Sequence, residues 1–111
     1  MVLYNIPTHV SGDTLNEIIF SLKYKSTEEP IDLTGASISM KIYTYGTTTP
    51  VVLELSTTNG KLILSDATGG KFKIDTQIIS LPDAKYTYDI IFTFPGSVIK
   101  TYIRGTWRII A

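Results

Sequence analysis

Residues 86–107 read YTYDIIFTFPGSVIKTYIRGTW, which is a pair of alternating segments joined by a proline-glycine step. From Tyr86 to Phe94, large apolar or aromatic side chains occupy every second position, with mostly polar residues between them. Successive side chains of a strand point to opposite faces, so this period predicts β-strands that each bury one face. Proline followed by glycine suits the central positions of a type II turn, which predicts a hairpin at Pro95-Gly96.

The same period recurs along most of the chain. The predicted strands are 18–24, 37–45, 51–55, 61–64, 71–75, 86–94 and 98–110. The long, bulky segments among them are expected at the sheet centres. Ile19 interrupts the alternation, which indicates either a strand covered on both faces or a bulge. Asn59-Gly60 predicts a tight hairpin turn, and residues 75–81 are compatible with one helical turn.

About seven to eight strands separated by turn signals are typical of a β-sandwich or a small barrel. The chain is therefore predicted to be all-β, and residues 1–111 are expected to form a single domain. The side chains predicted to fill the core share the apolar faces of the long strands. They are Ile38, Met40, Ile90, Phe92, Ile103 and Trp107.

The composition argues against several classes of partner. Ten basic residues balance ten acidic ones, and the chain has no cysteine, so disulfides and thiolate metal sites are absent. Nucleic-acid binding requires clustered lysine and arginine, whereas these lysines are dispersed. The longest apolar runs are far shorter than the ~20 residues of a membrane helix. The first residues also lack the regions of a signal peptide. We expect no nucleic-acid partner, no membrane partner and no signal-directed secretion.

No group of residues predicts catalysis. The single histidine, His9, has no second metal-ligand type nearby and is expected to be an exposed loop residue. A Gly-x-Ser-x-Gly elbow and a phosphate-binding loop are both absent. Most carboxylates lie in predicted turns, where they cap backbone amides. The set available for acid–base chemistry is Asp13, Glu17, Asp32, Glu54, Asp66, Asp75 and Asp89. We expect a protein that is not an enzyme and that has no catalytic residue, metal or cofactor.

The seven tyrosines are the most distinctive part of the composition. Tyrosine combines a large apolar ring with a polar tip, so it is favoured at interfaces and as a platform for sugars. Unbroken alternation places Tyr43, Tyr45 and Tyr102 on solvent-facing sides of their strands, and it places Ile99 on the buried side with Trp107. The tyrosines are therefore candidates for a contact surface.

Asp89 is the one carboxylate in the middle of a long aromatic strand. Its neighbours indicate a solvated face, or alternatively an interface salt bridge with Arg104 or Arg108. The complete set of candidate contact residues is Tyr43, Tyr45, Tyr102, Asp89, Arg104 and Arg108. A protein partner fits this set, and so does a glycan stacked on the tyrosines. No other small-molecule ligand is expected.

Several short phrases follow one another in a fixed order. They are Gly12-Asp13-Thr14, Asn16-Glu17-Ile18-Ile19-Phe20-Ser21-Leu22, Pro30-Ile31-Asp32-Leu33-Thr34-Gly35-Ala36 with the alternating strand that follows, Leu55-Ser56-Thr57-Thr58-Asn59-Gly60, Tyr86-Thr87-Tyr88-Asp89-Ile90 and Ile99-Lys100-Thr101-Tyr102-Ile103-Arg104-Gly105-Thr106-Trp107. Over residues 10–110 this series resembles the immunoglobulin-like N-terminal domain of the phage baseplate upper protein family and related prophage tail modules.

The resemblance implies an immunoglobulin-like antiparallel β-sandwich of about seven to eight strands that has no enzymatic activity. It further implies a virion protein, assembled in the host cytoplasm, that docks with other phage structural proteins in a tail or baseplate and forms a homo-oligomer. Family members often continue into C-terminal domains that attach receptors or fibres. Host recognition is therefore not implied for these residues.

Overall fold

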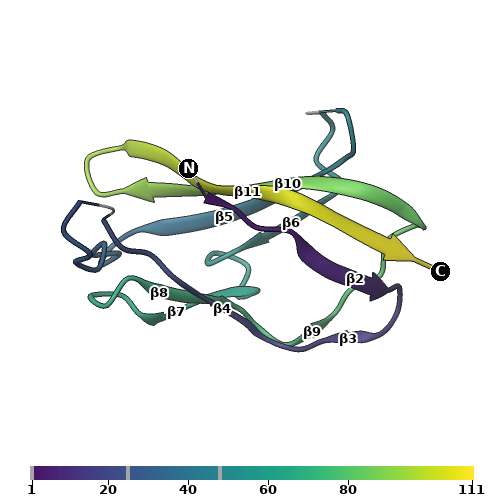
Figure 1. Cartoon of the computed structure of the whole chain (residues 1–111), viewed down its shortest axis with the longest axis horizontal. Coiled ribbons are helices and arrows are strands. Elements are labelled where there is room, and N and C mark those ends of the chain that lie inside the picture. Colours follow the sequence, from purple (N-terminus) through teal and green to yellow (C-terminus); the bar gives the residue numbers. More distant parts are fainter. Residues whose placement is uncertain (1, 25, 48) are drawn as a thin grey trace.

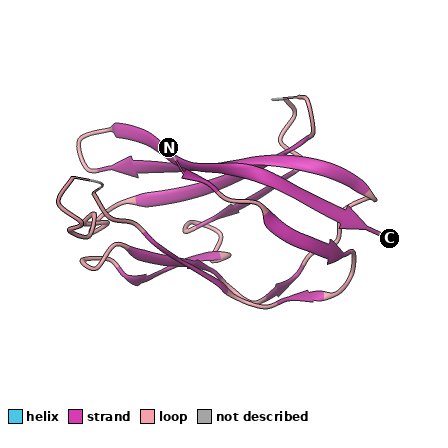
Figure 2. Cartoon of the chain, in the orientation of Figure 1, coloured by secondary structure: helices cyan, strands magenta, loops and turns pink. Residues whose placement is uncertain are grey.

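The computed structural model describes residues 2–24, 26–47 and 49–111, and over these ranges the chain is all-β with no helix (Figure 2). The strands, in chain order, are β1 (Val2–Leu3), β2 (Ile6–Val10), β3 (Thr14–Leu15), β4 (Ile18–Ser21), β5 (Ser37–Thr44), β6 (Leu53–Ser56), β7 (Leu62–Asp66), β8 (Lys71–Ile74), β9 (Gln77–Ile78), β10 (Ala84–Phe94) and β11 (Val98–Ile110). They form one large curled sheet and two small sheets (Figure 1). The all-β class is confirmed, with more and shorter strands than expected.

The large sheet has the order β1–β11–β10–β5–β6, and β2 also pairs with β11. The predicted central strands lie at its centre, because β10 is antiparallel to both β11 and β5. The expectation of a wholly antiparallel arrangement is wrong. Residues 2–10, where the alternation predicts no strand, form β1 and β2, and both run parallel to β11. The sheet is therefore mixed.

A second layer lies against the large sheet (Figure 1). It consists of the antiparallel sheet β4–β8–β7, with the small pair β3–β9 beyond one end. Three phenylalanines join the layers. The ring of Phe20 stacks on Phe72 at 4.9 Å between centroids, and Phe72 meets Phe92 of the large sheet edge-on at 5.3 Å. Such aromatic pairs add about 0.5–1.5 kcal/mol each to the gain from burial.

The predicted core is confirmed. The predicted residues are each at most 2% exposed, and they come from the three central strands β5, β10 and β11. They are Ile38, Met40, Ile90, Phe92, Ile103 and Trp107. Each such side chain stabilises the fold by about 1.5–3 kcal/mol through burial. The alternation that buries them also turns the residues between them outward, onto the solvent face of the large sheet.

The turn predictions have mixed outcomes. Gly96, between β10 and β11, has φ 84°, as the third position of a type II turn requires. Asn59-Gly60 also forms a turn, in which Asn59 Oδ1 accepts from the Ser56 and Lys61 amides. That turn does not close a hairpin, because β6 pairs in the large sheet and β7 in the small one. The chain changes layers at this point.

Two local expectations are wrong. Residues 75–81 form no helical turn, because Gln77–Ile78 pairs with β3 as β9 and Ile79 is buried in the core. Ile19 marks neither a bulge nor a doubly covered strand. It is 58% exposed on the open side of β4, where it lies in register with Lys73. No other layer of the described chain covers the side of this small sheet on which Ile19 lies.

A bulge in β11 reverses the direction of its side chains. Ile90 pairs with Ile103, but Ile91 pairs with Thr101, so Tyr102 is the extra residue. Beyond the bulge Ile99 is 64% exposed, and Tyr102 packs inward against Phe92 at 5.3 Å and Phe94 at 6.3 Å. The predicted facing of Ile99 and Tyr102 is therefore wrong, because one inserted residue flips a period of two.

The N-terminal segment bends beside β11 at Gly105. Leu3 pairs with Arg104, whereas Ile6 pairs with Trp107, so the backbone bends at Tyr4-Asn5. A Cβ on Gly105 would overlap the Tyr4 carbonyl oxygen, and only glycine admits this approach.

Two side chains hold the bend in place. The buried Tyr88 hydroxyl donates a hydrogen bond to the Tyr4 carbonyl oxygen. Asn5 Oδ1 accepts from the Thr106 amide at 3.1 Å and from the Thr106 hydroxyl at 3.0 Å. These bonds replace the ladder bonds that the bend interrupts.

The substitution Gly105→Ala is expected to detach the N-terminal segment. The new methyl group would overlap the Tyr4 carbonyl oxygen, and we expect a loss of about 1–3 kcal/mol in the free energy of unfolding. Urea unfolding measures that loss, and amide exchange should show lost protection over residues 2–10. Thr101→Ala, on the same strand but facing outward, serves as the control. Unchanged protection of residues 2–10 in Gly105→Ala would show that the close approach to Tyr4 does not hold the N-terminal segment in place.

Burial raises the pKa of the Tyr88 hydroxyl above its usual value, and the nearby Tyr4 adds to the shift. A phenol with a raised pKa in the folded state contributes stability below about pH 10 that is lost as the pH rises further. Tyr88→Phe should cost about 1–3 kcal/mol at pH 7, because the Tyr4 carbonyl loses its donor. It should also make the decline of stability above pH 10 shallower. Urea unfolding across pH 7–11 tests both effects, with the exposed Tyr45→Phe as control.

Candidate functional site

The outer face of the large sheet is built by the same alternation as the core. Tyr43 on β5, Thr87 on β10 and Thr106 on β11 lie side by side in register and point away from the buried residues. We call the solvent-facing side of β1, β11, β10, β5 and β6 the outer face. No second layer of the described chain covers it (Figure 1).

The outer face contains a hollow of about 620 Å³. It lies between the N-terminal segment on one side and the residues that follow β5 on the other. Its lining is Leu3, Asn5, Tyr43, Tyr45, Gly46, Thr47, Thr87, Asp89, Arg104, Gly105 and Thr106. Two of the three predicted contact tyrosines and the predicted Asp89–Arg104 pair therefore share one site. Leu3, 77% exposed, is the most exposed large apolar side chain of the described residues.

Four charged residues cross the outer face in one line, which we call the charge row. Glu54 of β6 pairs in register with Lys41 of β5, Lys41 pairs with Asp89 of β10, and Asp89 pairs with Arg104 of β11. Arg104 Nε lies 2.5 Å from Asp89 Oδ1. Among the described residues, neither Glu54 nor Lys41 has an ion-pair partner within 4.0 Å.

The two tyrosines of the hollow differ in their surroundings. Tyr43 is half-buried in the sheet beside Thr87. Tyr45 lies just beyond the end of β5 and is 55% exposed, with Lys85 Nζ 4.2 Å from its ring centroid. A cation at that distance is attracted to the ring and restricts its motion. Tyr45 is therefore an exposed aromatic group in a defined position.

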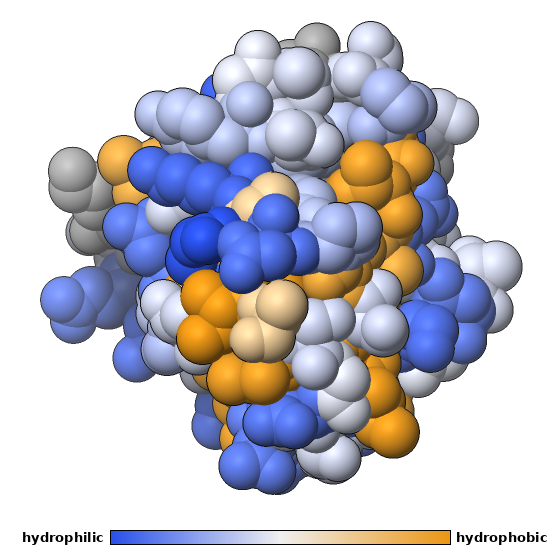
Figure 3. Space-filling model, turned by 90° about the vertical axis from the view of Figure 1, so that its right-hand side faces the viewer, coloured by the Kyte–Doolittle hydropathy of each residue, from blue (hydrophilic) through white to orange (hydrophobic). Residues whose placement is uncertain are grey.

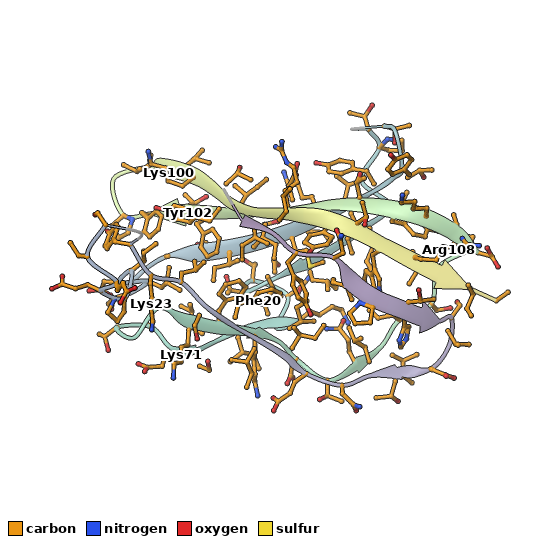
Figure 4. The ribbon with its side chains drawn as sticks, viewed as in Figure 1. Phe20, Lys23, Lys71, Lys100, Tyr102 and Arg108 are labelled. Carbon is orange, nitrogen blue, oxygen red and sulfur yellow. The ribbon has the colours of Figure 1, made fainter. Side chains whose placement is uncertain are left out.

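Arg108 and Tyr102, both predicted contact residues, lie outside the hollow. Arg108 is at the far end of β11 (Figure 4), where its Nη2 is 2.7 Å from Asp83 Oδ1. It does not pair with Asp89. Tyr102 lies toward the hairpin end of the same strand and faces the core because of the bulge. Burial raises the pKa of Tyr102, as expected for a ring held among phenylalanines.

Three further titratable groups have structural partners. His9 lies in β2 rather than in a loop, where its Nε2 donates to the Asp13 carbonyl at 3.0 Å and its ring is 6.2 Å from Trp107. Glu17 pairs with Lys73 at 2.7 Å. Asp66 Oδ1 accepts from the Gly69 amide at 3.2 Å, as turn chemistry predicts.

Across residues 2–24, 26–47 and 49–111 no three metal-ligating side chains come together. Within the same ranges there is no helix of the length and hydrophobicity needed to cross a membrane. Seen from the C-terminal side, apolar groups form separate patches between hydrophilic ones (Figure 3).

Sequence reasoning missed part of the hollow. Leu3 and Asn5 were not identifiable, because a parallel strand at the start of the chain has too few residues for a period to be seen. Thr87 and Thr106 are sequence neighbours of buried aromatic residues, and this pattern predicts only that the two threonines face solvent. Lys41 and Glu54 alternate correctly, but only the register of β5 and β6 shows that they align with Asp89.

No protein-family model, curated protein or solved structure matches the chain.

The Asp83 carboxylate holds the end of β11. It accepts from the Ala111 amide at 3.1 Å and from Arg108, and these bonds lower the pKa of Asp83 below its usual value. A lowered pKa contributes stability above about pH 3.9 that is lost as the pH falls through the folded-state value. The side-chain carboxyl carbon of Asp83 should therefore titrate with a midpoint below about pH 3.9 in an NMR titration, and Arg108→Gln, which removes a cationic donor to Asp83, should raise that midpoint. A midpoint at or above that ordinary value would show that the bond is not formed.

Proposed function

We propose that the chain is a non-enzymatic structural module of a phage or prophage tail or baseplate, and that it works through protein–protein contacts made by the outer face. The observation that carries the proposal is the combination on one face of an exposed apolar residue, aromatic side chains and ordered charges. Aromatic and arginine side chains are enriched at protein interfaces, and charges arranged in a pattern select the partner and its register. The ordered sequence phrases favour phage tails as the setting.

We further propose that the fold belongs to the immunoglobulin-like class. In its favour, one sheet runs β11–β10–β5–β6 and the other β4–β8–β7, which matches strands G, F, C and C′ against B, E and D. The difference lies at the start of the chain, because β1 and β2 join the β11 side of the large sheet. That placement makes the large sheet wider and leaves the second layer with few strands.

Particle incorporation tests the functional proposal. The tagged chain should appear, by mass spectrometry, in tail or baseplate particles purified from an induced host that carries the phage. Leu3→Asp should reduce its incorporation at least about tenfold, because a charge buried within a contact must be desolvated. Ile19→Asp places the same charge at an exposed position of the opposite sheet and should leave incorporation unchanged. Absence of the unmodified chain from purified particles would refute the role.

A carbohydrate-binding module is the second candidate, and one observation favours it. Tyr43 and Tyr45 line the same hollow as Asn5, Asp89 and Arg104, so ring faces and hydrogen-bonding groups are close together. Tyr102, its third proposed ring, faces the core instead. A glycan array with the unmodified chain and Tyr45→Ala separates the two candidates. Binding that disappears in Tyr45→Ala supports the glycan role, whereas an array without hits removes it.

A further inference from the structure

The order of signs in the charge row restricts how a second molecule can meet the outer face. From β6 to β11 the row reads Glu54, Lys41, Asp89, Arg104, so the signs alternate from negative to positive. Neighbouring strands are ~4.8 Å apart, so the row extends over roughly 14 Å. When a second copy of such a row is turned end to end and placed against the first, every negative charge faces a positive one.

Two copies placed face to face are related by a two-fold axis in the plane of contact. If the axis runs along the strands, between β5 and β10, the order of strands is reversed across the interface. Glu54 then faces Arg104 of the second copy, and Lys41 faces Asp89 of the second copy, so all four contacts join opposite charges. If the axis runs across the strands, every charge faces its own equivalent. Like charges in contact cost several kcal/mol, which excludes that arrangement.

We propose that the outer face binds a second copy of this chain through a two-fold axis parallel to the strands, between β5 and β10. This inference rests on the proposed function, since it names the partner of the same face. Glu54 and Lys41, which lack ion-pair partners in the described chain, obtain them from the second copy. The Asp89–Arg104 pair becomes part of a charge network that spans both copies.

The hollow is consistent with the same axis. Reversal of the strand order places β5 of each copy over β10 of the other, so Tyr43 lies above Thr87 of the second copy and Tyr45, two residues further along, lies above Lys85 of the second copy. Tyr43, Tyr45 and Thr87 all line the hollow. The tyrosine wall of each hollow therefore faces the threonine wall of the other copy's hollow.

The available area fits a dimer of moderate strength. Four strands that lie ~4.8 Å apart, each about eight residues long with a rise of ~3.3 Å per residue, cover a flat area of roughly 500 Å² per copy. Specific interfaces commonly bury about 800 Å² per partner, and weaker ones bury less. We therefore expect dimerisation in the micromolar range with a marked dependence on salt, because the charge row supplies much of the selectivity.

Complementary charge reversals test the axis directly. Lys41→Glu sets a carboxylate against Asp89 of the second copy, and Asp89→Lys sets an ammonium group against Lys41 of the second copy. Each variant alone therefore brings like charges together and should dimerise at least about tenfold more weakly than the unmodified chain. A 1:1 mixture of the two variants restores opposite charges at the contacts between unlike copies. Sedimentation velocity should show a heterodimer in the mixture with a Kd close to that of the unmodified chain.

The outer pair of the row provides a second, independent mixture. Glu54→Arg and Arg104→Glu should each be monomeric at concentrations where the unmodified chain dimerises, and together they should form a heterodimer. Lys71→Glu makes the same change of charge as Lys41→Glu on the other sheet (Figure 4) and should dimerise normally. Thermal unfolding of every variant verifies that it is folded.

The outcomes separate the two proposals. An unmodified chain that stays monomeric at several hundred micromolar, or mixtures that do not restore dimerisation, overturns the two-fold contact even if the chain is found in tail particles. A chain that dimerises as described but is absent from particles leaves the two-fold contact standing and refutes the tail role. Heterodimers in both mixtures, with Lys71→Glu behaving normally, support the axis.

Discussion

The close approach of the Tyr4 carbonyl to Gly105 is the contact on which the arrangement of the large sheet depends. At that point the N-terminal segment changes from pairing with Arg104 to pairing with Trp107. The absence of a side chain at residue 105 makes the approach sterically allowed, and the Tyr88 hydroxyl makes it energetically favourable. Because Tyr88 is itself part of the core, the packing of the interior and the path of the edge strand are linked. Leu3 and Asn5, which flank Tyr4 in the bend, line the hollow of the outer face.

The sequence was sufficient to predict the parts of the fold that depend on a local period. The strands over 86–94 and 98–110 and the six core residues follow from alternation, which burial of one face enforces, and the hairpin between the two strands follows from Pro95-Gly96. The parts that it could not predict depend on register or on distant partners. Tyr102 was placed on the wrong face because a single bulge residue is invisible in an alternating sequence. β1 and β2 were missed because parallel pairing of short segments with β11 has no local signature.

In the candidate site, too, the features that follow from a local period were predicted and those that depend on strand register were not. Tyr43, Tyr45, Asp89 and Arg104 were predicted as contact residues from their facing alone, and the structure brings them together in one hollow. The charge row could not be recognised from the sequence, because its members are dispersed from residue 41 to residue 104 and align only through three strand registers. The order of signs, rather than the number of charges, gives the face its selectivity, and the order exists only in the folded sheet.

The parallel pairing of the first strands with the last one also has a consequence for the order in which the chain can fold. Asn5 and Thr106 are hydrogen-bonded across a separation of 101 residues, so during synthesis the N-terminal segment emerges long before its partner. Contacts of such large sequence separation are closed late, because the loop entropy must be overcome first. The segment that covers the edge of β11 therefore leaves the ribosome well before β11 does and is among the last segments to pair. Until then, one long edge of the sheet stays open to other strands.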